Sequence, residues 1–159
     1  MGSLNFEYRD KVYLFFGEDA HYYIDLHVIY NAELNLSKKI RFMVDTGAYL
    51  TVINNFTANE LEHTLWKSIT ASIPLAGFAG STTATLKEIP KIVIGDRTLI
   101  GAKAAIPHDD TKQNILGMNI LEHFTFCMDT NNMCMYFADN PNYKLPEELK
   151  CLDVLSLQN

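Results

Sequence analysis

The residues best placed for chemistry are Asp45, Thr46 and Gly47, which directly follow the apolar run Phe42-Met43-Val44. An acidic residue that ends an apolar strand sits at the edge of the core, and a carboxyl group there can act in general acid–base catalysis. The other interpretation is a strand end that is closed by a polar turn, which Asp, Thr and Gly also favour. The tripeptide alone does not separate the two interpretations.

Two further features follow Asp45 along the chain. The segment Gly77-Phe78-Ala79-Gly80 lies between two β-prone stretches and predicts a glycine-containing hairpin. Further on, Ile115-Leu116-Gly117 leads into the short amphipathic stretch Met118 to His123. Taken singly, the first is an ordinary surface turn and the second is a core strand that ends at a helix.

Other arrangements of chemical residues are missing from the sequence. The histidines lack HxH or HExxH spacing, no serine lies in a G-x-S-x-G context, and neither a GxGxxG nor a GxxxxGK[ST] phosphate loop is present. Three cysteines are an odd number without zinc spacing, and Cys127 and Cys134 are interpreted as small buried hydrophobic residues, with pairing across a hairpin as the alternative. We expect no metal and no cofactor.

Composition limits the class of protein. The 159 residues include 19 acidic and 13 basic side chains, a formal charge of −6, which argues against a nucleic-acid partner. With 48% apolar and 20% charged residues, the chain suits one globular domain. Since no apolar run approaches the roughly 18 residues that span a bilayer, and no signal segment opens the chain, we expect a cytoplasmic protein without a membrane partner.

The elements that must position Asp45 are mostly strands. Ile24, Leu26 and Val28 alternate with more polar residues and predict a strand with one buried face. Thr57 and Glu60 form a capping-box pattern that predicts a short helix to about Trp66. The expected strands are 4–16, 22–30, 40–44, 50–53, two stretches within 73–89, 92–94, 98–100, 124–128 and 133–137, with further helical stretches at 118–123 and 147–157. So many short strands with one or two brief helices favour a small closed barrel.

The order of these signals resembles the retropepsin-like aspartic proteases. In that family each chain brings a hydrophobic-Asp-Thr-Gly-Ala loop, a glycine-rich flap hairpin, and an aliphatic-aliphatic-Gly segment before a short helix and a last strand. Here Val44 to Ala48 match the loop, Gly77 to Gly80 match the flap, and Ile115 to Leu121 match the third segment. The match covers about residues 22–137, and the longer termini resemble the elaborated cellular and bacterial members.

The resemblance implies a retropepsin-like closed acid-protease barrel with one lobe per chain. It also implies an aspartic endopeptidase in which Asp45 from each chain of a homodimer forms the dyad that activates water, with Thr46 and Gly47 holding the loop. Asp129-Thr130-Asn131 lacks the glycine and falls in a predicted hairpin turn, so it is not a second catalytic loop. The peptide substrate is expected to contact Ala48, Gly77, Phe78, Ala79 and Gly80.

The sequence departs from the viral members at Tyr49 and Leu50, where an acidic residue contacts the substrate backbone, and at Met118, where arginine is frequent. We expect an N-terminal extension over residues 1–20, the protease domain over 21–137 and a C-terminal tail over 138–159. Two alternatives stay open: an inactive retropepsin-fold module that binds peptides or dimerises, and an unrelated β-barrel in which Asp-Thr-Gly is only a turn.

Overall fold

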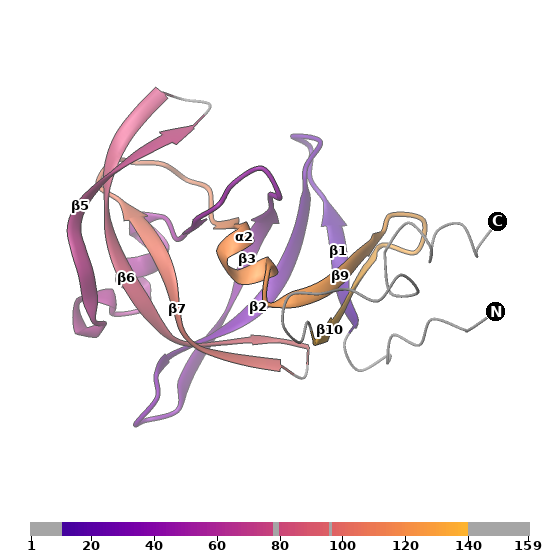
Figure 1. The fold of residues 1–159 in the computed structure, drawn as a ribbon, viewed down its shortest axis with the longest axis horizontal. Helices are drawn as coiled ribbons and strands as arrows, with labels where there is room; N and C mark the ends of the chain where they lie inside the picture. Colours follow the sequence, from indigo (N-terminus) through magenta and orange to yellow (C-terminus); the bar gives the residue numbers. More distant parts are fainter. Residues whose placement is uncertain (1–10, 78–79, 96, 140–159) are drawn as a thin grey trace.

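The computed structural model describes residues 11–77, 80–95 and 97–139, and Figure 1 shows a β-barrel with a smaller group of strands beside it. The strands in this part of the chain are β1 (Lys11–Phe16), β2 (Tyr22–Asn31), β3 (Leu36–Val44), β4 (Thr51–Val52), β5 (Ser68–Gly77), β6 (Gly80–Ile94), β7 (Arg97–Pro107), β8 (Ile115–Leu116), β9 (Phe124–Asp129) and β10 (Cys134–Asp139). The helices are α1 (Asn55–Glu60), the 3₁₀ helix η2 (His63–Leu65) and α2 (Met118–Leu121).

Six strands close the barrel in the order β2, β3, β8, β4, β7 and β6, and β6 returns to β2. At the closure, His27 of β2 lies opposite Val93 of β6 in an antiparallel pair. Closure hydrogen-bonds each of these six strands on both sides, which removes exposed edges from this part of the sheet. The prediction of a mostly-β closed barrel with short helices is confirmed.

The barrel core follows from the alternation in β2. Ile24, Leu26 and Val28 point inward and are buried, whereas His27 between them is exposed. Phe42 from β3 and Ile92 from β6 join them in the same cluster. Burial of several large aliphatic and aromatic side chains, each contributing about 1.5–3 kcal/mol, stabilises the barrel that carries the Asp45 loop.

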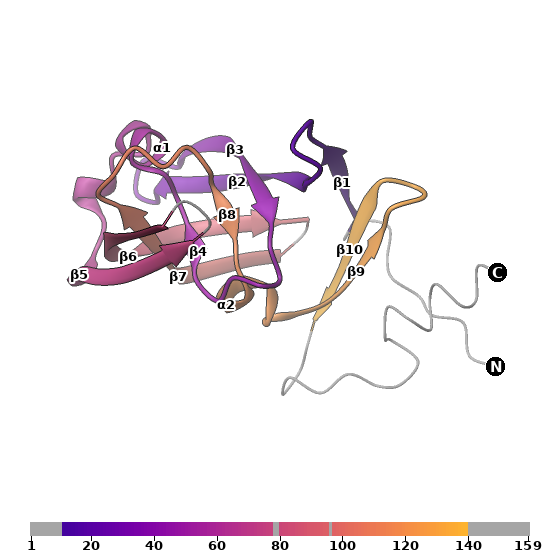
Figure 2. The same ribbon diagram turned by 90° about the horizontal axis from the view of Figure 1, so that it is seen from above.

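The strands β1, β10 and β9 extend the sheet beyond β2, and Figure 2 shows β9 and β10 to one side of the barrel. The β9–β10 hairpin was predicted and is present. Its register places Cys127 opposite Tyr136 and Cys134 opposite Asp129, so the two cysteines are not cross-strand partners. Both are buried and neither forms a disulfide, as the favoured interpretation has it.

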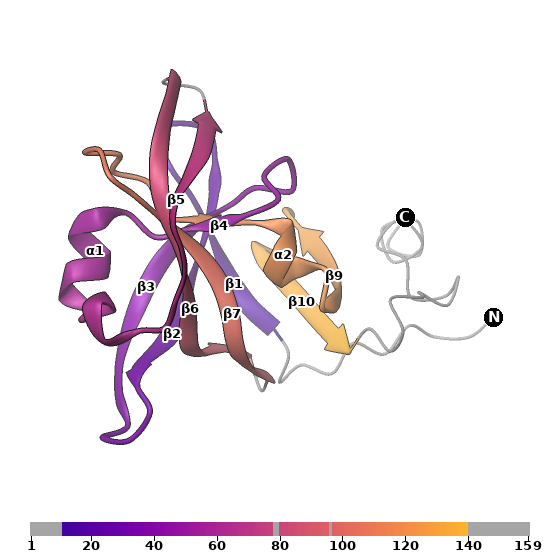
Figure 3. The same ribbon diagram turned by 60° about the vertical axis from the view of Figure 1, so that its left-hand side comes forward.

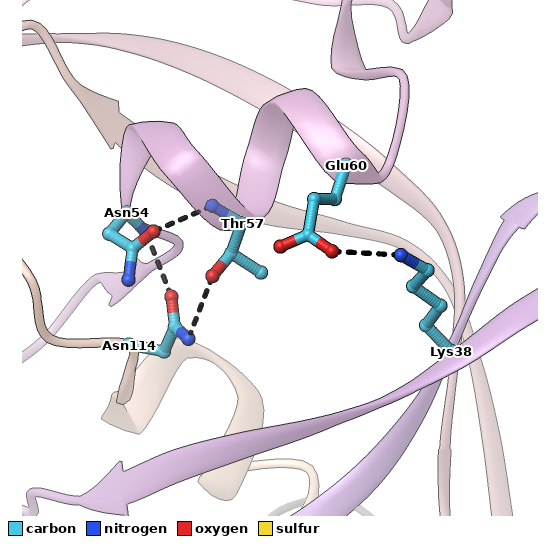
Figure 4. Close-up of polar contacts among 5 residues, drawn as sticks. All are labelled: Lys38, Asn54, Thr57, Glu60 and Asn114. Atoms are coloured by element: carbon cyan, nitrogen blue, oxygen red, sulfur yellow. Dashed lines mark hydrogen bonds and ion pairs between the residues drawn. The ribbon is translucent and has the colours of Figure 1, made fainter.

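Helix α1 lies on the other flank of the barrel and begins differently from the expectation (Figure 3). Its N-cap is Asn54, whose Oδ1 accepts the N–H of Thr57 at 2.7 Å; Thr57, the predicted cap, lies inside the helix. Glu60 does not reach back to the helix start and instead pairs with Lys38 of β3 at 2.9 Å (Figure 4). The helix also ends at Glu60, before the predicted limit.

A second correction concerns β6, which runs unbroken through Pro90, whereas the sequence predicts separate strands on either side of it. Pro90 has no N–H to give the ladder. The ladder to β7 pairs Ile89 with Ala102 and Lys91 with Ile100, so Pro90 lies opposite Gly101. Gly101 has a φ of 72°. The register is the same on both sides of Pro90, so the strand passes its proline without a shift in pairing.

Two predicted segments lie outside the described residues: the start of the first strand, 4–10, and the helical stretch 147–157. Across the described ranges, no helix has the length and apolar character needed to cross a bilayer.

Candidate active site

The Asp45 loop is built on a parallel strand pair. β3 lies parallel to β8, with Met43 beside Ile115 and Val44 beside Leu116. The pairing continues one step further, because the N–H of Asp45 donates to the carbonyl of Leu116 at 3.1 Å. Asp45 is therefore the first residue beyond the strand, where its half-buried side chain lies at the edge of the core as predicted.

Turn geometry fixes the carboxylate. The N–H of Gly47 donates to Oδ1 of Asp45 at 2.9 Å, and the N–H of Ala48 donates to the carbonyl of Asp45 at 3.2 Å. A Cβ atom at Gly47 would lie only 3.1 Å from the same Oδ1. The glycine thus leaves room for its own N–H to approach the acid, while Thr46 is exposed at the tip of the turn.

The segment after β8 holds the far end of the loop. Gly117 packs so closely against it that a Cβ atom would lie 2.6 Å from the carbonyl carbon of Leu50. The first amides of α2 then bond the loop carbonyls: Met118 N–H to Ala48 at 2.8 Å and Asn119 N–H to Tyr49 at 2.7 Å. The structure therefore brings together the Asp-Thr-Gly-Ala segment and the Ile-Leu-Gly segment, which the sequence resemblance pairs.

Thr51 and Asn119 also position the loop; Asn119 lies in the third segment that the resemblance matches, but the sequence reasoning assigned a role to neither residue. Oδ1 of Asn119 accepts the N–H and the hydroxyl of Thr51, both at 2.8 Å, and its Nδ2 donates to the carbonyl of Lys103 at 2.8 Å. The hydroxyl of Thr51 in turn accepts the N–H of Gly117 at 3.0 Å. Each of the two is a polar residue in an apolar segment, and that pattern alone does not predict which residue will be its hydrogen-bond partner.

Asn114, just before β8, ties the loop to α1. Its Oδ1 accepts the N–H of Asn54 at 2.9 Å and its Nδ2 reaches the hydroxyl of Thr57 at 3.3 Å (Figure 4). Its carbonyl accepts the N–H of Met43 at 2.8 Å. One asparagine therefore joins the start of the helix, the strand before Asp45 and the strand beside it.

The glycine hairpin lies on the same side of the barrel as the Asp45 loop (Figure 1). β5 and β6 pair up to Gly77 opposite Gly80, and Gly80 has a φ of 112°, a conformation that favours glycine. Phe78 and Ala79, the predicted tip, lie outside the described residues. Behind the hairpin, a small apolar cluster joins β5 and β6 to β4 and β8; its members include Ile73, Leu75, Ala84, Leu50, Val52 and Ile115.

An ion pair between Arg41 and Asp25 joins β3 to β2 just before the Asp45 loop. Arg41 of β3 donates from Nε and Nη2 to the two carboxylate oxygens of Asp25 on β2, at 2.8 and 3.0 Å, and its guanidinium carbon lies 4.1 Å from the ring centre of Phe15. These hydrogen bonds lower the pKa of Asp25 below its ordinary value of 3.8, against a smaller opposing effect of burial. The fork fixes β2 against the strand that leads to Asp45.

The second Asp-Thr pair has a different role. Asp129 is 1% exposed, and its Oδ1 accepts the N–H groups of Asn131 and Asn132, both at 3.1 Å. It therefore closes the β9–β10 turn, as an Asx turn does. Within the described ranges, no group of three or more His, Cys, Asp or Glu residues is arranged to hold a metal ion.

Known proteins share this fold. The family model described as gag-polyprotein putative aspartyl protease matches residues 30–123. The crystal structure of a retropepsin-like aspartic protease from Rickettsia conorii aligns with a TM-score of 0.58 and 25% identity over 80% of this chain and 98% of that one. EIAV protease in complex with the inhibitor HBY-793 aligns with a TM-score of 0.52 and 17% identity over 68% of this chain and 91% of that one. No curated protein matches the sequence.

Proposed function

The chain belongs to the gag-polyprotein putative aspartyl protease family and has the retropepsin-like fold, and from this premise we propose that it is an aspartic endopeptidase whose active form is a homodimer. Each chain contributes Asp45. The observation that carries the proposal is the placement of that carboxyl, half-buried after an apolar strand and held through its backbone by Leu116 and through its side chain by Gly47.

Peptide hydrolysis needs a base that takes a proton from water and an acid that protonates the carbonyl oxygen and then the leaving amine. Two adjacent carboxyls that share one proton supply both roles, as is established for aspartic proteases. One chain provides one such loop, so the second carboxyl comes from a symmetry-related copy. The exposed Thr46 and Gly47 at the tip of the turn leave the loop open for that contact.

The flap completes the proposed site. Gly77 and Gly80 flank the tip, and the Phe78–Ala79 segment would cover a bound peptide from above. Ala48, on the opposite side, carries its carbonyl in a hydrogen bond to Met118 and keeps its place in the loop. Peptide would therefore bind between the Asp45 loop and the flap hairpin.

The test is cleavage of a denatured protein at pH 4 to 6, with and without a statine-type transition-state analogue. We expect inhibitor-sensitive cleavage by the wild type and a loss of at least about a thousandfold in Asp45→Asn, because the amide cannot exchange the proton. Glu33→Gln is the matched control, since Glu33 is exposed in the turn between β2 and β3, at the other end of β3 from Asp45.

Retained turnover in purified Asp45→Asn would remove this carboxyl from the mechanism. Binding of the analogue or of peptides without any cleavage by the wild type would instead identify an inactive peptide-binding module.

A further inference from the structure

A histidine outside the Asp45 loop sits at the base of the flap hairpin. His108 directly follows β7, and its N–H donates to the carbonyl of Thr83 at 2.9 Å, one step beyond the last β6–β7 pair, Ala84 with Pro107. From this point towards Gly80, β6 pairs with β5 and leaves β7 behind. His108 thus marks where the hairpin leaves the barrel.

Both ring nitrogens of His108 contact β6. Nδ1 lies 2.8 Å from the hydroxyl oxygen of Thr83, and Nε2 lies 2.7 Å from that of Thr85. The hydroxyl of Thr85 also donates to the carbonyl of Ala71 on β5, at 3.1 Å. One imidazole is therefore connected, directly or through a threonine, to both strands of the hairpin.

The hydrogen bonds have a defined direction. A carbonyl oxygen only accepts, so the single proton of the Thr85 hydroxyl goes to Ala71. Thr85 must then accept from His108, which requires a proton on Nε2. With Nε2 protonated in the neutral ring, Nδ1 accepts from the hydroxyl of Thr83.

The carbonyl of Ala71, which accepts the hydrogen bond from Thr85, belongs to an irregular part of β5. The register pairs Thr70 with Leu86 and Ile73 with Ala84, so two residues, Ala71 and Ser72, oppose the single Thr85. Such a bulge bends a strand and leaves a backbone group outside the ladder. The Thr85 hydroxyl satisfies that group, and His108 holds the hydroxyl in place.

We propose that His108 is a positioning residue of the flap, which through Thr83 and Thr85 fixes the β5 bulge and so sets the hinge about which the Gly77–Gly80 end moves. Its effect on catalysis rests on the proposed function. On the far side of this hinge, residues 73–77 and 80–83 pair with each other, and the apolar cluster behind the hairpin holds Ile73 and Leu75 against the barrel.

Amide hydrogen exchange tests the hinge without requiring activity. In His108→Ala and Thr85→Val, amides of residues 73, 75–77 and 80–84 should exchange about fourfold to a hundredfold faster than in the wild type, because each of two lost hydrogen bonds changes the opening equilibrium about two- to tenfold. Thr85→Ser keeps the hydroxyl and should exchange like the wild type. The control His27→Ala, which removes an exposed histidine from β2, should leave the flap unchanged.

Equal flap exchange in His108→Ala and His27→Ala would overturn the proposal, as would acceleration spread evenly over the barrel. Nitrogen-15 spectra of the wild type provide a second readout, in which we expect the Nε2–H tautomer; the Nδ1–H tautomer would overturn the relay.

Peptide kinetics test the consequence for catalysis. His108→Ala should raise KM more than it lowers kcat, since the flap closes on bound peptide, and an unchanged KM would refute the positioning role. If the wild type cleaves no peptide, the proposed function fails, and the hinge is still decided by the exchange experiment.

Discussion

At the scale of single residues, the loop depends on the absence of a side chain at Gly117. Its φ of −98° is ordinary for any residue, so the requirement for glycine comes from space alone. A methyl group would press on the backbone of Leu50 and Tyr49, which belongs to the Asp45 loop. Because backbone cannot rotate away as a flexible side chain does, the loop itself must move.

We predict that Gly117→Ala lowers the free energy of unfolding by about 1–3 kcal/mol and reduces peptide cleavage further than stability alone explains. Urea unfolding and cleavage assays on the folded variant measure the two effects. Glu33→Ala, in an exposed turn, should change stability by no more than about 0.5 kcal/mol. Wild-type stability and activity in Gly117→Ala would show that the close contact relaxes freely.

The sequence identifies residues whose role lies in a local pattern and misses those whose partners are distant. Asp45 and Gly117 stand in motifs, so they were found. Asn119 and Asn114 act through hydrogen bonds to segments sixty or more residues away, and a lone asparagine predicts no partner. The capping box at Thr57 failed for two reasons: Asn54, a competing cap only three residues earlier, starts the helix, and Glu60 pairs with the more distant Lys38.

At the scale of elements, the pairing of β2 with β3 is reinforced by a direct cross-strand ion pair. Asp25 lies opposite Arg41 in the register, and Phe15 of β1 covers the guanidinium. Since the pKa of Asp25 is lowered in the folded chain, its stabilising contribution is complete above the unfolded value of about 3.8 and is lost as the pH falls through the lower folded value.

We predict that Asp25→Asn costs at most about 1 kcal/mol of unfolding free energy at pH 7, because Arg41 is half-exposed and solvent weakens the pair. The difference from the wild type should be complete above the ordinary Asp25 pKa of 3.8 and should shrink as the pH falls through the lower folded value. Urea unfolding at several pH values measures it. A difference that grows on acidification would contradict the assigned sign.

Strand existence was easier to predict than strand extent. The alternation in β2 and the hairpin of β9 with β10 were evident in the sequence and are present. The sequence predicts strands within 73–89 and at 92–94, whereas β6 continues through Pro90, which lies opposite Gly101 in the register. Gly101 lies on another strand, β7, so the sequence around Pro90 does not predict this pairing.

At the scale of the whole molecule, we predict that activity requires two chains. A single carboxyl is a poor base with no acid beside it, so Asp45 gains its chemistry from a copy across a twofold axis. A lasting dimer should bury at least about 1,200 Å² in total. Dilution should therefore lower specific activity, measured together with mass by light scattering.

Mixing the wild type with Asp45→Asn chains sharpens this test. At a ninefold excess of the variant, random pairing leaves about one-tenth of the wild-type chains with a wild-type partner, and activity should fall to about that fraction. Glu33→Gln chains at the same excess should not lower it. Cleavage by a monomer, at a rate strictly proportional to concentration, would refute the shared dyad.

The bonds that shape the Asp45 loop also order events during synthesis. The N–H of Asp45 cannot form its hydrogen bond until Leu116 has been synthesised. The carbonyls of Ala48 and Tyr49 likewise need the N–H groups of Met118 and Asn119. These partners leave the ribosome about seventy residues later, and contacts so distant in sequence form late because the intervening chain must be ordered first. A nascent chain thus carries Asp45 long before the residues that hold its loop in place have been made.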